Sequence, residues 1–384
     1  MHILFLPIAY PNTYNHTSGV FFHEQAQALA VNGHKVGVLA LVGIPFGSMF
    51  RTFKISLGLF RYADRVDVWR YQYLSIPKIG VINNLIRVHI GKRIFKNYLK
   101  QNGLPDIIHV HVSLAGSLAV WIKQKYNIPY VVTEHSSLFL GKDKMSWWRK
   151  MIVNRVYAGS SANVSVSEKL KNEMLIQYGV RSTVIPNAVD VNYFDIQKRP
   201  VEKNKGFAFL NIANFNSNKN QAMLIRAFKK AFEGDNSYKL IVAGGGSEKR
   251  SLQSLVNELN LSGQVTLLDM MSREEVKALM YASDCFVLSS YKETFGVVLV
   301  EAMSSGLPVI STKSGGPESI ITEDKLGILC DVTVESIASA MKQVVTKKYD
   351  FAYIRAQAEK RFSYNAFVEQ ITPLYTMVIN TKNV

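Results

Sequence analysis

Two glutamates eight residues apart, Glu293 and Glu301, stand in the stretch best suited to binding a polar ligand. The apolar run 285–288 before them predicts a buried strand, and the segment after Phe295 has helical character. Glu293 would therefore lie at the carboxyl edge of a sheet, where open α/β sheets bind ligands, and Glu301 inside a helix. The N–H groups of residues 294–297 would form an anion site at the helix start. Carboxylates that bind hydroxyls beside such a site suit a nucleotide sugar, although an ordinary surface ion pair remains the alternative.

Three further loops follow predicted strands of the same half. The loop 214–220 opens a helix and places Lys219 to meet a phosphate, and the loop 244–246 is a run of three glycines that permits close backbone approach to a ligand. The loop 315–318 is of the same kind. Four such loops on one edge of one sheet favour a phosphate or sugar site far more strongly than any one of them.

Alternating apolar strands and helices indicate an α/β protein with two parallel sheets. The first series runs from the strand at residues 2–9 to the strand at 182–185, and the second begins at Phe207. A polar, basic linker at 195–205 separates them, and 351–379 predicts one or two final helices. Residues 43–64 are ambiguous and are interpreted as a mobile loop on the acceptor side.

Histidines mark the carboxyl end of two predicted strands in the first half. His109 lies within its strand and is expected to pack, whereas His111 and His135 lie where the chain leaves the sheet. A single histidine is more often a structural residue. Two at adjacent strand ends favour a functional role.

Composition sets outer limits on the class of protein. The chain has 384 residues, enough for two domains, and 48% of them are hydrophobic. No apolar run approaches the roughly 20 residues needed to span a bilayer, and the amino terminus resembles a first strand rather than a signal peptide. Two cysteines are too few for a disulfide framework or a zinc cluster, which favours a reducing cytoplasm.

Positive charge is concentrated in the first half of the chain. The net charge is +16, of which residues 1–190 carry +13. Between Arg51 and Lys100, eleven basic residues face two acidic ones and alternate with aromatic and aliphatic residues. This pattern favours an anionic membrane surface over RNA, while solvated helix faces remain the alternative, and we expect no nucleic-acid partner.

Several motifs together resemble one enzyme family nearly from end to end. They are Glu293-x7-Glu301, Ile185-Pro186-Asn187-x-Val189-Asp190, Glu301-Ala302-Met303 with Gly306-Leu307-Pro308-Val309, Gly315-Gly316-Pro317-Glu318 and a final helix containing Tyr375. The chain resembles the retaining glycosyltransferases of family 4. That resemblance implies the GT-B fold, in which two Rossmann-like doubly wound domains face a central cleft. It implies an acceptor-binding domain at 1–187, a nucleotide-sugar-binding domain at 206–360, and a tail at 361–384 whose helix returns to the first domain.

The resemblance also assigns roles to individual residues. Glu301 would bind the donor ribose, Glu293 the transferred sugar, and Lys219 the phosphates. His111 would lie beside the reacting sugar and His135 on the acceptor side. The catalytic set is therefore His111, Glu293 and Lys219. The donor-binding set is Gly19, Asn214, Lys219, Gly244, Gly246, Arg250, Glu293, Thr294, Phe295, Gly296 and Glu301.

Some positions depart from the family pattern. Ala213-Asn214 stands where the family usually has Gly-Arg, so one expected cation is missing and Arg250 is the suggested substitute. Gly245 stands where Asp is common, Ser18-Gly19 replaces Gly-Gly, and Asn187-Ala188 replaces Asn-Gly. These departures affect donor binding and leave the expected fold unchanged.

The absence of an Asp-x-Asp pair predicts transfer without a metal, and no cofactor is expected. The helix start and Lys219 would stabilise the leaving nucleoside diphosphate. The sequence contains no carboxylate that can be assigned as a nucleophile. This favours front-face attack, in which the acceptor approaches from the side that the diphosphate leaves and the leaving phosphate takes the acceptor proton.

The expected function is a hexosyltransferase-type reaction from a nucleotide sugar to a lipid-linked saccharide. The product would be a bacterial surface polysaccharide such as lipopolysaccharide O-antigen or capsule, made at the inner face of the cytoplasmic membrane. Two alternatives are a sugar-nucleotide epimerase on the same fold and a non-catalytic GT-B scaffold in a polysaccharide assembly complex. A dehydrogenase is disfavoured because the first strand lacks a G-x-G-x-x-G loop.

Overall fold

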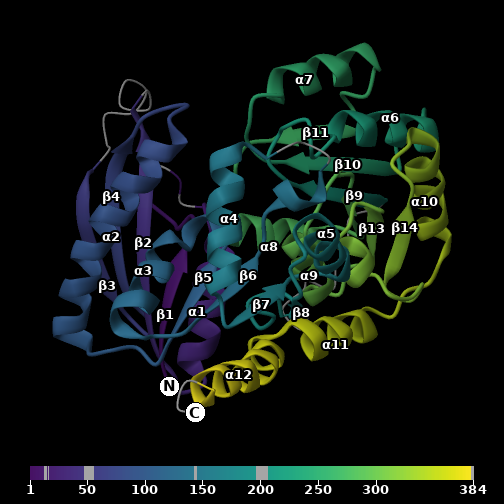
Figure 1. Ribbon diagram of the computed structural model, residues 1–384. Helices are drawn as coiled ribbons and strands as arrows, with labels where there is room; N and C mark the ends of the chain where they lie inside the picture. Colours follow the sequence, from purple (N-terminus) through teal and green to yellow (C-terminus); the bar gives the residue numbers. More distant parts are fainter. Residues whose placement is uncertain (13–14, 16, 47–55, 142–144, 196–205, 382–384) are drawn as a thin grey trace. The chain divides into compact units, whose positions relative to one another are not determined.

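A computed structural model describes the chain except for residues 13–14, 16, 47–55, 142–144, 196–205 and 382–384. The chain divides into two compact units (Figure 1). The first comprises Met1–Ala188 together with Tyr364–Val384, and the second comprises Val189–Ser363.

The first unit contains an eight-stranded sheet in the order β3-β4-β2-β1-β5-β6-β7-β8. All neighbouring strands are parallel except β3 and β4, which are antiparallel. The strands are β1 (His2–Pro7), β2 (Lys35–Pro45), β3 (Gly58–Ala63), β4 (Asp67–Ser75), β5 (Ile107–His111), β6 (Tyr130–Glu134), β7 (Ala162–Ser165) and β8 (Thr183–Val184). Every residue of β1, β5 and β6 is buried, as expected for parallel strands covered on both faces.

Helices cover both faces of this sheet. One core cluster joins β1 and β2 to α1 (Val20–Val31) and α12 (Tyr364–Asn380), so the last helix packs within the first unit. On the other face lie α2 (Gly80–Asn102), α3 (Ser117–Tyr126) and α4 (Trp147–Gly159), side by side (Figure 1). Gly91 allows that packing, because a Cβ there would lie 2.7 Å from Leu118 and 2.8 Å from Leu41. The unit also contains α5 (Glu168–Tyr178).

The second unit contains a six-stranded, wholly parallel sheet in the order β11-β10-β9-β12-β13-β14. Its strands are β9 (Phe207–Ile212), β10 (Tyr238–Ala243), β11 (Val265–Leu268), β12 (Cys285–Leu288), β13 (Val309–Thr312) and β14 (Gly327–Cys330). Its helices are α6 (Gln221–Phe232), α7 (Lys249–Glu258), α8 (Arg273–Ala282), α9 (Val297–Ser304), α10 (Val334–Thr346) and α11 (Phe351–Phe362). The direction in which successive strands are added to the sheet reverses between β9 and β12. Doubly wound sheets bind ligands in the crevice at such a reversal.

The interpretation of residues 43–64 as one loop is wrong where the structure describes them. Residues 43–45 complete β2, and 58–63 form β3, which pairs with β4 from Gly58↔Gln72 to Ala63↔Asp67. Ladder hydrogen bonds to β4 override the weak local signal of this exposed edge strand. The central part of the expected loop, 47–55, lies outside the described residues. In the second unit, the loop 315–318 runs into a single 3-10 turn, Pro317–Ser319.

Candidate functional site

The loop after β12 holds Glu293 against a second loop of the same sheet. The Glu293 N–H donates to the Ser314 carbonyl at 2.9 Å, and the Gly316 N–H donates to the Glu293 carbonyl at 2.8 Å. Glu293 and Gly315 thereby form an isolated parallel bridge. The carboxylate is thus carried on backbone that is hydrogen-bonded on both sides, at the carboxyl edge where the sequence places it.

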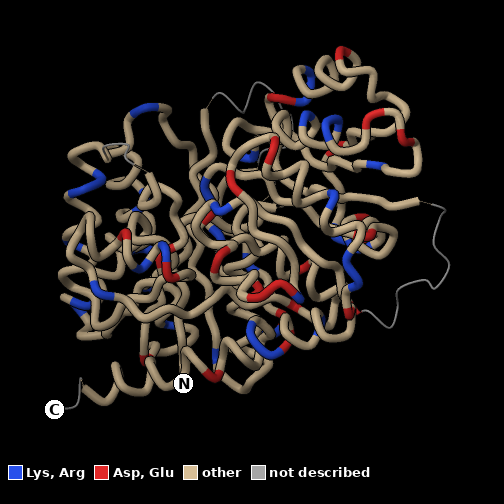
Figure 2. The backbone as a smooth tube through the Cα atoms, turned by 90° about the vertical axis from the view of Figure 1, so that its right-hand side faces the viewer, with Lys and Arg blue, Asp and Glu red and all other residues tan. Residues whose placement is uncertain are grey.

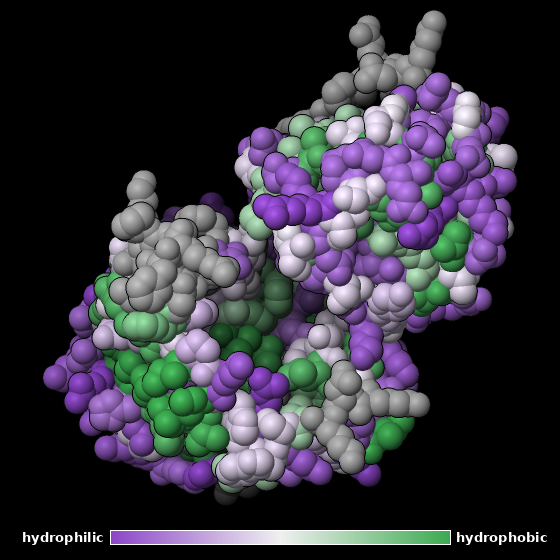
Figure 3. Space-filling model, turned by 90° about the horizontal axis from the view of Figure 1, so that it is seen from above, coloured by the Kyte–Doolittle hydropathy of each residue, from purple (hydrophilic) through white to green (hydrophobic). Residues whose placement is uncertain are grey.

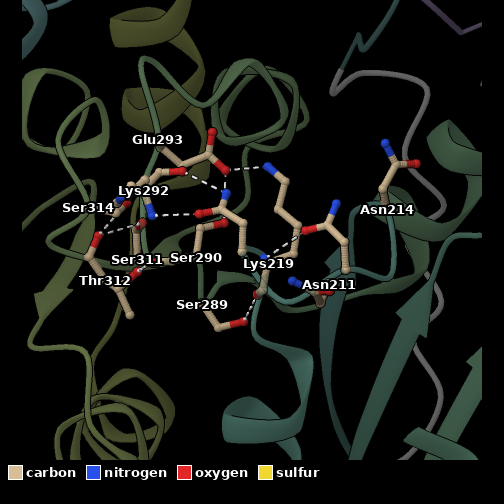
Figure 4. Close-up of polar contacts among 12 residues, drawn as sticks. Asn211, Asn214, Lys219, Ser289, Ser290, Lys292, Glu293, Ser311, Thr312 and Ser314 are labelled. Atoms are coloured by element: carbon tan, nitrogen blue, oxygen red, sulfur yellow. Dashed lines mark hydrogen bonds and ion pairs between the residues drawn. The ribbon is translucent and has the colours of Figure 1, made fainter. Parts of the chain in front are cut away.

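Glu293 forms an ion pair with Lys219 (Figure 4). The Ser290 hydroxyl donates to the same carboxylate oxygen at 2.8 Å. The side chains of Lys219 and Glu293 are 24% and 13% exposed, so both remain open to a ligand. The structure brings together two residues that lie 74 positions apart and that the sequence assigns to phosphate and sugar.

The turn that carries Lys219 is braced by polar side chains to which the sequence reasoning gave no role. Ser289 Oγ donates to the Lys219 carbonyl at 2.8 Å. Asn218 binds the backbone of Lys292 twice: its Nδ2 donates to the Lys292 carbonyl at 2.9 Å, and its Oδ1 accepts from the Lys292 N–H at 3.2 Å. The concentration of asparagine in 214–220 is the signal that could have identified this brace, because asparagine side chains satisfy loop backbone.

The helix α9 begins directly after this loop. Gly296 precedes it with φ of 104°, a left-handed conformation that favours glycine. Phe295 is 1% exposed and packs edge-on against Phe362 at 5.7 Å, so its side chain belongs to the core. Residues Thr294, Phe295 and Gly296 can therefore serve a ligand through backbone N–H groups, and the first N–H groups of α9 have no acceptor within the helix.

Glu301 lies in the second turn of α9. Burial raises the pKa of its carboxyl group, and the positive charge of Arg273 opposes that shift. Within the part of the chain that the structure describes, its carboxylate has no hydrogen-bond partner. A carboxylate in this condition is suited to accept hydrogen bonds from a pair of ligand hydroxyls.

Close backbone packing within the protein explains why residues 244 and 246 are glycines. A Cβ on Gly244 would lie 1.9 Å from the Ala213 carbonyl oxygen, and one on Gly246 would lie 2.3 Å from that of Phe215. The Phe215 N–H also donates to the Gly245 carbonyl at 2.8 Å. The close approach that these glycines allow is therefore to the loop 213–215, which carries Asn214.

Asn214 and Arg250 stand apart from the ion pair. Both are exposed, and Arg250 lies in the first turn of α7. Neither hydrogen-bonds to Lys219 or Glu293 among the described residues. In this structure Lys219 is thus the cation placed beside Glu293, and the suggested role of Arg250 stays a prediction.

In the first unit, His111 and His135 form a buried pair. His111 Nδ1 lies 3.2 Å from His135 Nε2, and the two outer ring nitrogens have no partner in the described chain. Burial lowers the pKa of His135 to about 3 and that of His111 well below its ordinary value, because the charged imidazolium is desolvated. Both rings are therefore neutral at pH 7, and one of them donates to the other.

His135 faces a pocket and His111 lies behind it. The pocket is lined by Gly19, His135 and their neighbours, whereas His111 is fully buried. Gly19 has φ of 69°, and a Cβ there would lie 2.5 Å from the Ala9 carbonyl oxygen. The structure thus places Gly19 and His135 at one pocket, while His111 reaches it only through His135.

Glu134 organises this corner, and the sequence analysis gave it no role. Its carboxylate is fully buried and accepts from the N–H groups of His135 and Ser136, the N–H and hydroxyl of Ser113, and the hydroxyl of Tyr157. These five hydrogen bonds fix the loop that carries His135. A buried glutamate at the end of an apolar strand is the signal, because it requires such partners.

His109 packs, as the sequence indicates. Its Nε2 lies 2.7 Å from Thr133 Oγ1, and its Nδ1 lies 2.6 Å from the Tyr375 hydroxyl on α12. Burial lowers the pKa of His109 to about 3. This histidine therefore joins the last helix to the sheet.

No group of three or more His, Cys, Asp and Glu side chains could hold a metal ion within the described residues. In the same residues, no helix combines the length and apolar character needed to cross a membrane.

Comparison with known proteins covers most of the chain. The family profile "Glycosyltransferase Family 4" matches residues 18–193, and "Glycosyl transferases group 1" matches 193–367. An uncharacterized glycosyltransferase of Methanocaldococcus jannaschii is 31% identical over 260 residues, covering 67% of this chain and 70% of that protein. The chain belongs to glycosyltransferase family 4. This confirms the family expected from the Glu293-x7-Glu301 motif.

Two further relatives of this family 4 glycosyltransferase align over most of its length. The N-acetyl-alpha-D-glucosaminyl L-malate synthase of Bacillus anthracis is 27% identical and covers 82% of this chain and 80% of its own. A putative teichuronic acid biosynthesis glycosyltransferase of Bacillus subtilis is 25% identical and covers 89% and 88%. The chain is therefore an enzyme of the glycosyltransferase class, and its named relatives support the hexosyltransferase type.

Solved structures confirm the GT-B fold. A sucrose-phosphate synthase from Thermosynechococcus elongatus has a TM-score of 0.77 at 19% identity and covers 99% of this chain and 100% of its own. Anabaena HepE in complex with UDP has a TM-score of 0.72 at 19% identity and covers 98% and 100%. The two parallel-rich sheets are thus the two Rossmann-like domains expected for this fold.

Proposed function

We propose that this enzyme transfers a sugar from a nucleotide-sugar donor to a lipid-linked saccharide, with retention at the anomeric carbon and without a metal. The product would be a surface polysaccharide, assembled at the inner face of the cytoplasmic membrane. The observation that carries the donor half is the Lys219–Glu293 pair beside the start of α9.

In this proposal the donor diphosphate enters beside Lys219. The ammonium group and the free N–H groups of α9 offer positive charge where the leaving diphosphate gains negative charge. Lys219 would exchange Glu293 for a phosphate, which releases the Glu293 carboxylate to accept hydrogen bonds from the sugar. Glu301, whose carboxylate has no hydrogen-bond partner among the described residues, would bind the ribose hydroxyls.

Retention is what the resemblance to the retaining family 4 enzymes implies, and a double displacement would need a carboxylate nucleophile that the sequence does not mark. The resemblance assigns Glu293 to the hydroxyls of the transferred sugar, and the Ser290 hydroxyl donates to one of its carboxylate oxygens. The acceptor would then attack from the face that the diphosphate leaves. The C–O bond to phosphate breaks, the new glycosidic bond forms, and the departing phosphate takes the acceptor proton.

The surface of the first unit supports two other parts of the proposal, the lipid-linked acceptor and the membrane location. Helices α2, α3 and α4 carry ten Lys and Arg residues and no Asp or Glu. Figure 2 marks Lys and Arg in blue and Asp and Glu in red along the described backbone. Exposed apolar side chains accompany the charges, among them Leu85 at 63% and Trp147 at 73%. Such a surface suits anionic lipid headgroups.

The test is a transfer assay on the purified enzyme. Nucleotide sugars are first screened for thermal stabilisation, and the best donor is then incubated with lipid-linked saccharides in the presence of EDTA. We expect full activity in EDTA, and a product whose anomeric configuration by NMR matches the donor. An inverted anomeric configuration in the product would contradict the front-face mechanism. Strong inhibition by EDTA, with activity restored by a divalent cation, would contradict transfer without a metal.

A further inference from the structure

A second pocket opens at the carboxyl edge of the first sheet. It has a volume of about 220 Å³ and is lined by the ends of β2 and β4, by the starts of α2 and α4, and by two guanidinium groups, those of Arg87 and Arg149. It shares Ile8 and Leu114 with the pocket that contains His135. The two pockets are therefore neighbours along the same edge of the sheet.

The two arginines in this pocket lack a counter-charge. Arg87 Nη2 donates to Asn84 Oδ1 at 2.9 Å and to the Leu114 carbonyl, and burial lowers its pKa. Arg149 Nε is buried and has no hydrogen-bond partner among the described residues. No carboxylate pairs with either guanidinium in the part of the chain that the structure describes. A desolvated guanidinium group at Arg87 and a buried Nε at Arg149 on one pocket favour a bound anion, and arginine pairs best with carboxylate or phosphate.

The starts of two helices add to this preference. Gly80 and Asn83 of α2 line the pocket, as do Trp148 and Arg149 of α4. Neither Ile79 nor Ser146, the residues that precede these helices, makes a side-chain capping bond. The first turns of both helices thus line the same pocket as the guanidinium groups, and a helix start favours an anion.

An apolar groove continues outward from this pocket. It has a volume of about 300 Å³, lies between α2, α3 and α4, and shares Asn84 and Trp148 with the arginine pocket. Its walls include Leu85, Val88, Trp121, Met151 and Ile152. Figure 3 shows hydrophobic side chains gathered on this unit, to the lower left of the view. Leu85 is 63% exposed and Met151 is 56% exposed, so the groove is open to solvent.

We propose that these three connected spaces bind one amphiphile: the phosphate ester of a long-chain hydrocarbon alcohol. The phosphate lies between Arg87 and Arg149, the hydrocarbon chain lies in the groove of α2, α3 and α4, and a sugar on the phosphate extends toward His135. The charge of the three helices fits this anionic ligand, since they carry ten cations and no carboxylate. The inference rests on the proposed function and specifies the class of its acceptor.

The test is a direct binding measurement that needs no donor and no turnover. Farnesyl phosphate is titrated below its micellar concentration into the full chain by isothermal calorimetry, with farnesol and inorganic phosphate as partial ligands. We expect farnesyl phosphate to bind at least about tenfold more tightly than either one, because each lacks one half of the contacts. Equal binding of farnesol would overturn the phosphate subsite.

Matched variants separate this site from general attraction to positive charge. Arg149→Gln should weaken farnesyl phosphate about tenfold and leave farnesol unchanged, whereas Lys150→Gln, an equal charge change at the exposed neighbouring residue, should have no effect. Leu85→Gln should weaken the chain-bearing ligands, whereas Ile176→Gln, which is 77% exposed on α5, should not. Equal losses within either pair would contradict the proposal, and thermal melting confirms that each variant is folded.

The outcome is distinguishable from that of the proposed function. If the enzyme transfers sugar to a lipid-linked saccharide but does not bind farnesyl phosphate, the proposed binding pocket is contradicted and the proposed function is not. If the chain binds farnesyl phosphate but transfers sugar only to a water-soluble acceptor, the binding pocket is supported and the lipid-linked acceptor is contradicted.

Discussion

At the residue scale, the candidate donor site depends on Lys219 exchanging one anionic partner, the Glu293 carboxylate, for another, the donor diphosphate. Lys219 and Glu293 neutralise each other without a ligand, and both remain partly exposed. Diphosphate binding would remove Lys219 from Glu293, so each residue is satisfied before and after the donor enters. Ser290 and Asn218 hold the two loops that make this exchange possible.

Replacing Lys219 should reduce turnover far more than folding stability. Lys219→Ala removes a cation from the leaving diphosphate, for which a loss of about 10²–10³ in kcat is typical. Lys239→Ala is the matched control, because that exposed lysine donates to the Gly263 carbonyl, away from Lys219 in the sequence and in its hydrogen bonds. Steady-state kinetics with a saturating donor measure the effect. Wild-type kcat in the Lys219 variant would show that another group stabilises the leaving diphosphate.

The pH dependence of stability should report the buried histidines. The pKa of His135 falls from its ordinary value of 6.5 to about 3 on folding, so the unfolded chain binds the proton first. The stability from neutral His135 is therefore complete above pH 6.5 and is lost as the pH falls toward 3. We expect His135→Gln to lower the pH slope of the unfolding free energy between pH 6 and 4 by up to about 1.4 kcal/mol per unit. Urea unfolding at several pH values measures this slope, and an unchanged slope would mean that His135 is protonated in the folded chain.

At the element scale, each candidate site is a set of loops at the carboxyl edge of a parallel sheet. The loops are held by one another rather than by their own helices: 291–295 binds 314–316, and 213–215 binds 244–246. Glycines stand where two such backbones touch. A site built in this way keeps its geometry only if the loop-to-loop contacts remain intact.

A methyl group at Gly316 should therefore disturb the Glu293 loop. A Cβ there would lie 2.3 Å from Phe295 Cα, although the φ of −75° suits any residue. We expect Gly316→Ala to lower the free energy of unfolding by about 1–3 kcal/mol and to weaken donor binding. Gly263→Ala is the control, since nothing lies within 4 Å of its Cβ position. Denaturant unfolding compares the two, and equal stabilities would show that the loops shift apart without cost.

Most elements could be predicted from the sequence because their apolar periods are strong. The strands around Phe5, Val110 and Val287 are continuous buried runs, and Lys219 and Glu293 each lie in the loop that follows a strand. The edge strand β3 could not be predicted, because its side chains are mostly exposed and its hydrogen bonds come from β4. The five hydrogen bonds of Glu134 could not be predicted either, since their donors are brought to it by separate elements.

At the scale of the whole molecule, the charge is divided between the two halves of the chain. Residues 1–190 carry +13 of the net +16, and three adjacent helices of the first unit carry cations alone. A charge distribution of this kind is suited to a negatively charged surface. Residues 191–384 carry only the remaining +3.

Attraction to anionic vesicles should depend on this surface and on salt. We expect sedimentation with phosphatidylglycerol vesicles at low salt, and release near 0.5 M salt because exposed charges are then screened. The pair Arg93→Gln with Lys96→Gln should reduce binding, and the pair Lys342→Gln with Lys348→Gln in the second unit should not. Equal reduction by both pairs would show that net charge, rather than the three-helix surface, attracts the chain.

The central claim is sugar transfer from a nucleotide donor to a lipid-linked acceptor at the Lys219–Glu293 site. Acceptor-dependent release of nucleoside diphosphate in EDTA tests it most directly, with wild type and Glu293→Gln compared side by side. The account expects release only when donor and lipid-linked saccharide are both present, and a loss of about 10- to 100-fold in the variant. Equal release from Glu293→Gln, or a lack of release by wild type with any lipid-linked saccharide, would contradict it.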